Sequence, residues 1–145
     1  MDRFGLGFLT GLAAAAFCAT PMMADEMAAG GTIAIELNAV SDDTSGCTLT
    51  FVIENNHPVG IDQLIFETVL FDASGGVKQL TLFDFGALPA GRPRVRQFAV
   101  PETTCGSLGR ILFNGTHTCS SDGLSAEACA TELRATTRTE IEVLS

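Results

Sequence analysis

Hydrophobic and polar positions alternate with a period of two along most of the chain beyond residue 31, which is the period of a half-buried β-strand. Ile33, Ile35 and Leu37, for example, are separated by Ala34 and Glu36. The pattern predicts seven strands, at residues 33–38, 47–53, 61–71, 77–85, 94–100, 110–114 and 139–144. The third of these runs is apolar on both faces, so we expect it to lie in the centre of a sheet.

The segments between the strands are rich in the turn-forming residues Gly, Pro, Asn and Asp. Seven short strands without a convincing amphipathic helix predict an all-β fold over residues 32–145. We expect a seven-stranded, antiparallel sandwich of the immunoglobulin-like or fibronectin-like kind. The one irregularity is the polar stretch 115–138, which includes a candidate helical turn at 125–133. A connection of this length is usually functional or held in place.

The first 24 residues have the features of an export signal that is cleaved. Arg3 precedes an apolar run, Pro21 breaks it, and small residues end at Ala24. Cleavage a few residues later, near position 28 or 29, is the alternative. The apolar run is shorter than the about 20 residues that span a bilayer, so we expect no stable membrane anchor after cleavage. Residues 25–31 then form a flexible leader.

Composition points to a bacterial source. Lys78 is the only lysine beside seven arginines, and Ala and Gly are abundant, which is typical of a GC-rich bacterial genome. With an export signal, this predicts a periplasmic location. A lipid anchor on Cys18 is an alternative, but Phe17 stands where such sites have a small residue. The net charge of −9 repels nucleic acid and anionic lipid, so we expect neither as a partner.

Four cysteines follow the predicted signal, an even number that suits an oxidising compartment. Cys47, Cys105, Cys119 and Cys129 allow three pairings. If successive strands alternate in direction, Cys47 and Cys105 lie at the same end of the sandwich. We therefore expect one disulfide between them, and a second that closes the loop between Cys119 and Cys129. Redox chemistry is the alternative, but the chain has no CxxC motif and no basic residue beside any of these cysteines.

Motifs of hydrolases and metalloenzymes, such as GxSxG and HExxH, do not occur in the sequence. The carboxylates at positions 42, 43, 72 and 122 stand in turns, which recruit Asp for structural reasons. Glu67 is unusual because it lies in an apolar strand. It is either a buried functional acid or, as we expect, a side chain on the outer face of a strand. We predict no enzymatic activity and no cofactor.

Alternating strands also predict a surface that binds a partner. Strands two, four and six would end at one pole of the sandwich, together with the loop between the last two cysteines. The predicted partner-binding residues there are Asn55, His57, Leu88, Asn114, His117 and Asp122. A copper-binding module that uses His57 and His117 is the alternative, because imidazole suits transition metals. Exposed loop histidines without a ligand are the simpler interpretation.

Short motifs give one resemblance. The pair Gly46–Cys47 and the segments VLFD (69–72), GALPAG (86–91) and GRILFN (109–114) resemble a group of small exported proteobacterial proteins, usually labelled only by a signal, often of the twin-arginine type. This chain lacks the arginine pair. Some members of that group are encoded near TonB/ExbB-like transport systems, so the resemblance implies a protein partner and no catalytic residues. Together these features predict a non-catalytic periplasmic sandwich that binds a protein partner or an envelope component.

Overall fold

The computed structural model describes residues 31–129 and 132–145. The predicted signal peptide and the leader up to residue 30 lie outside the described residues. The elements are β1 (Ile33–Asp43), β2 (Gly46–Asn55), β3 (Ile61–Asp72), β4 (Val77–Leu88), β5 (Arg94–Val100), the 3-10 helix η1 (Cys105–Ser107), β6 (Leu108–Ser120), α1 (Ala126–Cys129), β7 (Leu133–Thr137) and β8 (Glu142–Leu144). No helix in this part of the chain is long and apolar enough to cross a membrane.

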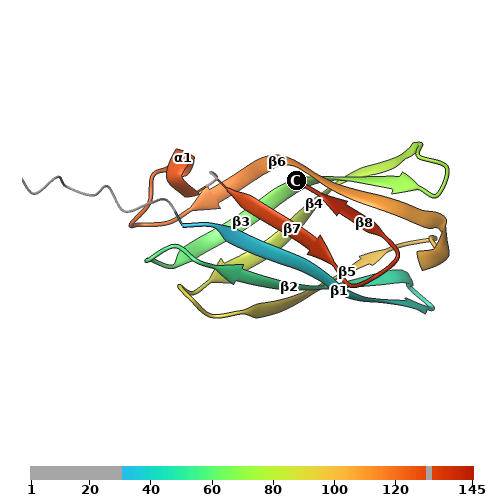
Figure 1. The fold of residues 1–145 in the computed structure, drawn as a ribbon, viewed down its shortest axis with the longest axis horizontal. Coiled ribbons are helices and arrows are strands. Elements are labelled where there is room, and N and C mark those ends of the chain that lie inside the picture. The colour runs from blue at the N-terminus through green and yellow to red at the C-terminus, as the bar shows by residue number, and fades with distance from the viewer. Residues whose placement is uncertain (1–30, 130–131) are drawn as a thin grey trace, which may run out of the picture.

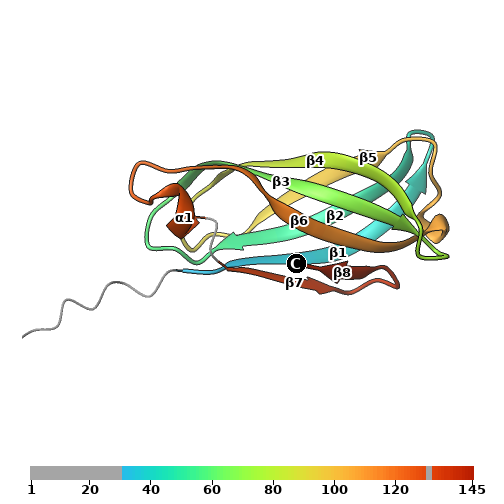
Figure 2. The same cartoon turned by 90° about the horizontal axis from the view of Figure 1, so that it is seen from above.

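Two four-stranded sheets pack face to face as a sandwich (Figure 1). One sheet has the order β5-β2-β1-β7 and the other has the order β4-β3-β6-β8. Figure 2 shows β4, β3 and β6 in one layer, with β1 and β2 in the other. The prediction of an all-β sandwich is therefore confirmed, and β3 occupies the central position expected for a strand that is apolar on both faces.

The core between the sheets is built from the alternating apolar positions of both layers. Phenylalanine fills much of this core, since the chain has neither Trp nor Tyr. The ring of Phe51 lies 5.8–6.0 Å from the rings of four other phenylalanines, measured between centroids. Phe83 and Phe98, from opposite sheets, stack with their centroids 4.2 Å apart. Such packed aromatic pairs add stability beyond the burial of their area.

The prediction of seven strands, all antiparallel, is wrong at the C-terminal end. The described residues form eight strands, and β7 pairs parallel with β1 while β8 pairs parallel with β6. The predicted strand 139–144 is reduced to β8, and β7 lies in the polar stretch 115–138, for which the pattern predicts no strand. The consecutive strands β7 and β8 thus belong to different sheets. The predicted helical turn is present as the shorter helix α1.

Arg96 of β5 links the free edges of the two sheets. Its Nε donates a hydrogen bond to the carbonyl oxygen of Phe85 (2.8 Å), and its Nη2 donates one to that of Ala87 (3.2 Å), both on β4. Alternating arginines in a strand are typical of a solvated face. Arg96 is instead half-buried and satisfies backbone groups of the edge strand opposite it.

Candidate partner-binding site

The loops after β2 and β4 meet at one end of the sandwich, where buried Asn55 ties them together. Its Nδ2 donates hydrogen bonds to the carbonyl oxygens of Val59 (2.9 Å) and Leu88 (3.0 Å). Its Oδ1 accepts one from the backbone N–H of His57 (2.9 Å), and its backbone carbonyl accepts another from Gly91 (2.7 Å). One fully buried side chain therefore sets the conformation of both loops.

The loop between Cys119 and Cys129 packs onto the same end. Its disulfide is formed as predicted, and Cys129 is buried. The Ser121 hydroxyl donates a hydrogen bond to the carbonyl oxygen of Gly60 (2.6 Å), and Gly123 lies so close to Val59 that a Cβ would come within 3.0 Å of it. We call this end, with residues 56–60, 89–93 and 119–129, the loop pole; α1 marks it in Figure 2.

His57 lies inside the loop pole rather than on its surface. Its side chain is buried, and neither Nδ1 nor Nε2 has a hydrogen-bond partner. Burial lowers the pKa of the imidazole below its ordinary value, because burial disfavours the charged form. Gly31 fits against it only because it lacks a side chain, since a Cβ there would come within 2.4 Å of the His57 Cα. Burial therefore favours the neutral form of the His57 ring.

The six predicted partner-binding residues fall into two groups. Asn55, His57 and Leu88 are buried, so they shape the loop pole but offer it almost no surface. Asn114, His117 and Asp122 are exposed.

Only Asp122 of the exposed residues is in the loop itself. Because β6 runs on to Ser120, Asn114 and His117 lie within the strand, each as the extra residue of a β-bulge opposite β3. Partner binding at this pole stays a prediction that now rests on the loop 119–129.

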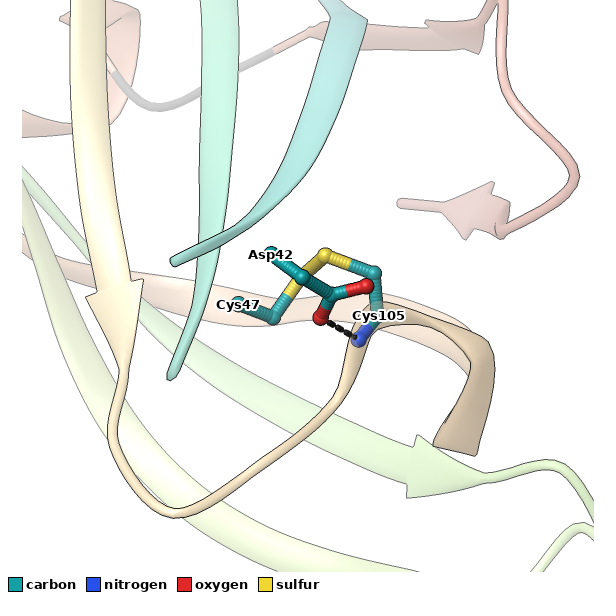
Figure 3. A group of neighbouring side chains, drawn as sticks. All are labelled: Asp42, Cys47 and Cys105. Atoms are coloured by element: carbon teal, nitrogen blue, oxygen red, sulfur yellow. Dashed lines mark hydrogen bonds between the residues drawn. A yellow bond between two sulfur atoms is a disulfide. The ribbon is translucent and has the colours of Figure 1, made fainter. Parts of the chain in front are cut away.

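The other predicted disulfide, Cys47–Cys105, holds the opposite end of the sandwich. Its Cα atoms are 4.9 Å apart, and the Asp42 carboxylate accepts a hydrogen bond from the Cys105 backbone N–H (2.7 Å; Figure 3). In the described part of the chain, these three residues form the one group of at least three potential metal-binding side chains. Sulfurs that are bonded to each other are not thiolate ligands, so the group is structural.

Two of the four predicted turn carboxylates, Asp43 and Asp72, bind the local backbone. Hydrogen bonds from Ser45 and then Thr48 hold the pKa of Asp43 below its ordinary value. In the β3–β4 turn, the Ser74 hydroxyl and the backbone N–H of Gly76 lower the pKa of Asp72 in the same way. Glu67 lies exposed on the outer face of β3, which confirms its expected orientation.

Comparison of the chain with protein-family models, with curated proteins and with solved structures gives no match. The function must therefore be argued from the chain's own surfaces. One of these surfaces, the exposed leucines of β4, is not among the residues that the sequence predicts to bind a partner. The signal was available, because the run from 77 to 85 is apolar at both odd and even positions. A run of this kind fits either a central strand that is covered on both faces or an edge strand that exposes apolar side chains. The position of β4 at the edge of its sheet shows that the second case applies.

Proposed function

We propose that the protein is a non-catalytic, exported β-sandwich that binds a protein partner or an envelope component through the loop pole. The observation that carries the proposal is the loop 119–129, which its own disulfide closes and which contacts Val59 and Gly60. An ordered loop loses less conformational entropy when it binds. Connections between elements of a compact domain usually take about 4–6 residues, so this loop is longer than a typical crossing from the sheet of β6 to the sheet of β7.

The chemistry of the loop suggests the kind of surface it meets. Asp122 and Glu127 are exposed, and the loop contains no lysine or arginine. An acidic, ordered loop suits a partner surface that carries positive charge, because complementary potentials speed encounter and disfavour wrong partners. The loop also contains a short helix, α1, in which the Ala128 N–H donates a hydrogen bond to the Ser125 hydroxyl oxygen (3.1 Å).

The two disulfides indicate an oxidising location outside the cytoplasm. We propose the periplasm in particular, on the basis of the signal-like first 24 residues. The resemblance to exported proteobacterial proteins supports an accessory role beside a TonB/ExbB-like system. We further propose an immunoglobulin-like or fibronectin-like relationship for the sandwich, supported by β1, β2 and β5 sharing one sheet while β3 and β6 are neighbours in the other. The parallel pairings of β7 and β8 depart from that plan.

The copper-binding alternative has weaker support. It requires the two histidines to reach one ion, yet His57 is buried among the loops whereas His117 is exposed within β6. Metal analysis of the protein purified from cells, with and without added copper, tests it directly. Stoichiometric copper that is lost in a His117→Ala variant would favour this alternative over partner binding alone.

Site-specific photo-crosslinking in cells tests the proposed function. A photoreactive residue at Asp122 should form a discrete crosslinked species, whereas one at Glu102, exposed at the opposite end, should not. A Cys119→Ala/Cys129→Ala variant should fold but crosslink less from position 122, because the loop loses its restraint. The proposal fails if position 122 gives no discrete product, or if position 102 gives the same one.

A further inference from the structure

Exposed apolar side chains concentrate on one edge strand. Among the described residues, five large hydrophobic side chains are exposed, and three of them are on β4: Val77 (60%), Leu80 (71%) and Leu82 (50%). β4 is the outer strand of its sheet, so one of its long sides has no neighbouring strand. A long edge strand with exposed leucines is a template for pairing with another strand.

The free part of this edge has defined limits. Residues 79–84 pair one to one with β3, and a β-bulge bounds this regular segment on each side, at Lys78 and at Phe85. Beyond it, Arg96 occupies the carbonyl oxygens of Phe85 and Ala87. Within the described part of the chain, no hydrogen bond from any strand other than β3 reaches the backbone of residues 77–84.

The even-numbered positions of this edge are complementary about Thr81. Leu80 and Leu82 flank Thr81 at equal distances, and further out Lys78 stands on one side as Asp84 stands on the other. In an antiparallel pair of identical strands related by a two-fold axis at Thr81, Leu80 lies opposite Leu82 of the other copy. Lys78 then lies opposite Asp84. Opposed apolar pairs and opposite charges are the cross-strand pairs that stabilise sheets.

We propose that this edge binds a second copy of the chain, through antiparallel β4–β4 pairing centred on Thr81. The pairing joins the β4-β3-β6-β8 sheets of the two copies into one continuous sheet and brings four leucines together on one face. The two neighbouring registers that keep the leucines of both copies on the same face have the two-fold axis at Leu80 or at Leu82. The first places Leu82 opposite Lys78, and the second places Leu80 opposite Asp84. Charge complementarity therefore selects the Thr81 register. Lys78, the only lysine of this acidic chain, is the residue that pairs with Asp84 in this register.

A lysine and bulges on an edge strand also serve to keep other strands away. That simpler function predicts a monomer, so the two interpretations differ in solution. An edge contact buries less area than a standard interface, and the dimer should therefore be weak and depend on concentration. Sedimentation equilibrium of the purified protein, with its disulfides formed, should show a monomer–dimer equilibrium. A monomer at every concentration up to about 1 mM overturns the proposal.

Charge-swap variants test the register. Lys78→Asp and Asp84→Lys should each weaken the dimer about tenfold, because each variant opposes like charges at two symmetric places. The double variant should restore dimerisation, since it rebuilds both opposite-charge pairs with the residues exchanged. Lys78 and Asp84 are both exposed, and Asp84→Lys removes only exposed hydrogen bonds, such as that from the Gly86 N–H (2.8 Å), so the fold should tolerate the changes. A double variant that stays as weak as the single variants overturns the pairing.

Crosslinking gives a second measurement of the same register. A Thr81→Cys variant should react with a short bis-maleimide to give a covalent dimer, because residue 81 faces its own copy across the axis. The matched control is Gln97→Cys, an exposed position on β5, the edge strand of the other sheet. Equal crosslinking at both positions means random collision and counts against the proposal, as does the absence of any product from position 81.

Discussion

Removal of the Asn55 side chain should destabilise the domain far more than removal of an exposed asparagine. Asn55 lies at the end of β2, and its amide is fully buried between the loops that follow β2 and β4. An Asn55→Ala substitution removes hydrogen bonds to Val59, Leu88 and His57. The free energy of unfolding should fall, because these backbone groups lose a partner that water does not readily replace.

The magnitude follows from three bonds. Each contributes a net of about 0.5–1.5 kcal/mol, and a buried group left unpaired costs about 1–3 kcal/mol. The bonds to Leu88 and His57 are buried and the one to Val59 is partly buried. We therefore expect a loss of about 3 kcal/mol, against a total stability of roughly 5–15 kcal/mol for a domain of this size.

Urea denaturation at neutral pH is the assay, with Asn114→Ala as the matched control. Asn114 is exposed, so its truncation should change the free energy of unfolding by less than about 0.5 kcal/mol. Asn55→Asp is a second test: it keeps the size and the acceptor for His57, but it places a carboxylate oxygen against two carbonyl oxygens. It should be at least as destabilising as the alanine. A loss below about 1 kcal/mol for Asn55→Ala would refute the role assigned to this side chain.

Two further predictions concern stability. Cys47→Ala/Cys105→Ala should cost about 4 kcal/mol and Cys119→Ala/Cys129→Ala about 3 kcal/mol, since the bridged residues are 58 and 10 apart in sequence; a larger loss for the second pair in urea would contradict this. The lowered pKa of His57 means that the unfolded chain takes up its proton first as pH falls. The contribution of neutral His57 to the free energy of unfolding is therefore complete above the ordinary pKa of about 6.5 and declines below it. The free energy of unfolding should thus be lower at pH 5 than at pH 7.5, and this difference should be smaller in a His57→Leu variant.

The sequence predicted the strands best where one face of the strand is apolar. The strand expected at 94–100 is β5 as observed, and the first five predicted strands all coincide with strands of the structure. β6 was predicted too short because Gly115, Thr116, His117 and Thr118 give no apolar alternation. The bulges at Asn114 and His117 also shift the period of side chains in this region.

The sequence pattern does not predict β7, for a related reason. Its inward positions are Leu133 and Ala135, which are only half-buried, while Arg134 and Thr136 face outward. Two half-buried positions, of which one is only an alanine, are too few to reveal a period of two in a short edge strand. Its parallel pairing with β1 depends on where the chain returns after the loop 119–129, and local sequence does not determine that return.

The candidate site was predictable as a location but not in its details. Alternating strand directions were enough to bring the loops near His57 and Leu88 to one end. The period of two through Phe51 and Ile53 places Asn55 on the inner face of β2, whereas Asn56 lies beyond the strand and is exposed. Alternation does not reveal what the buried amide binds, because its partner at Leu88 is a carbonyl 33 residues away.

The two proposed surfaces are compatible, and their geometry gives the dimer a property that neither surface has alone. β4 ends at Leu88, beside the loop pole, and the proposed pairing stops at Asp84 before the carbonyl groups that Arg96 occupies. Antiparallel pairing would therefore send the two loop poles to opposite ends of the dimer and leave both free. A partner with several sites fixed in the envelope could then be held at two points, which raises the apparent affinity without any new contact at either pole.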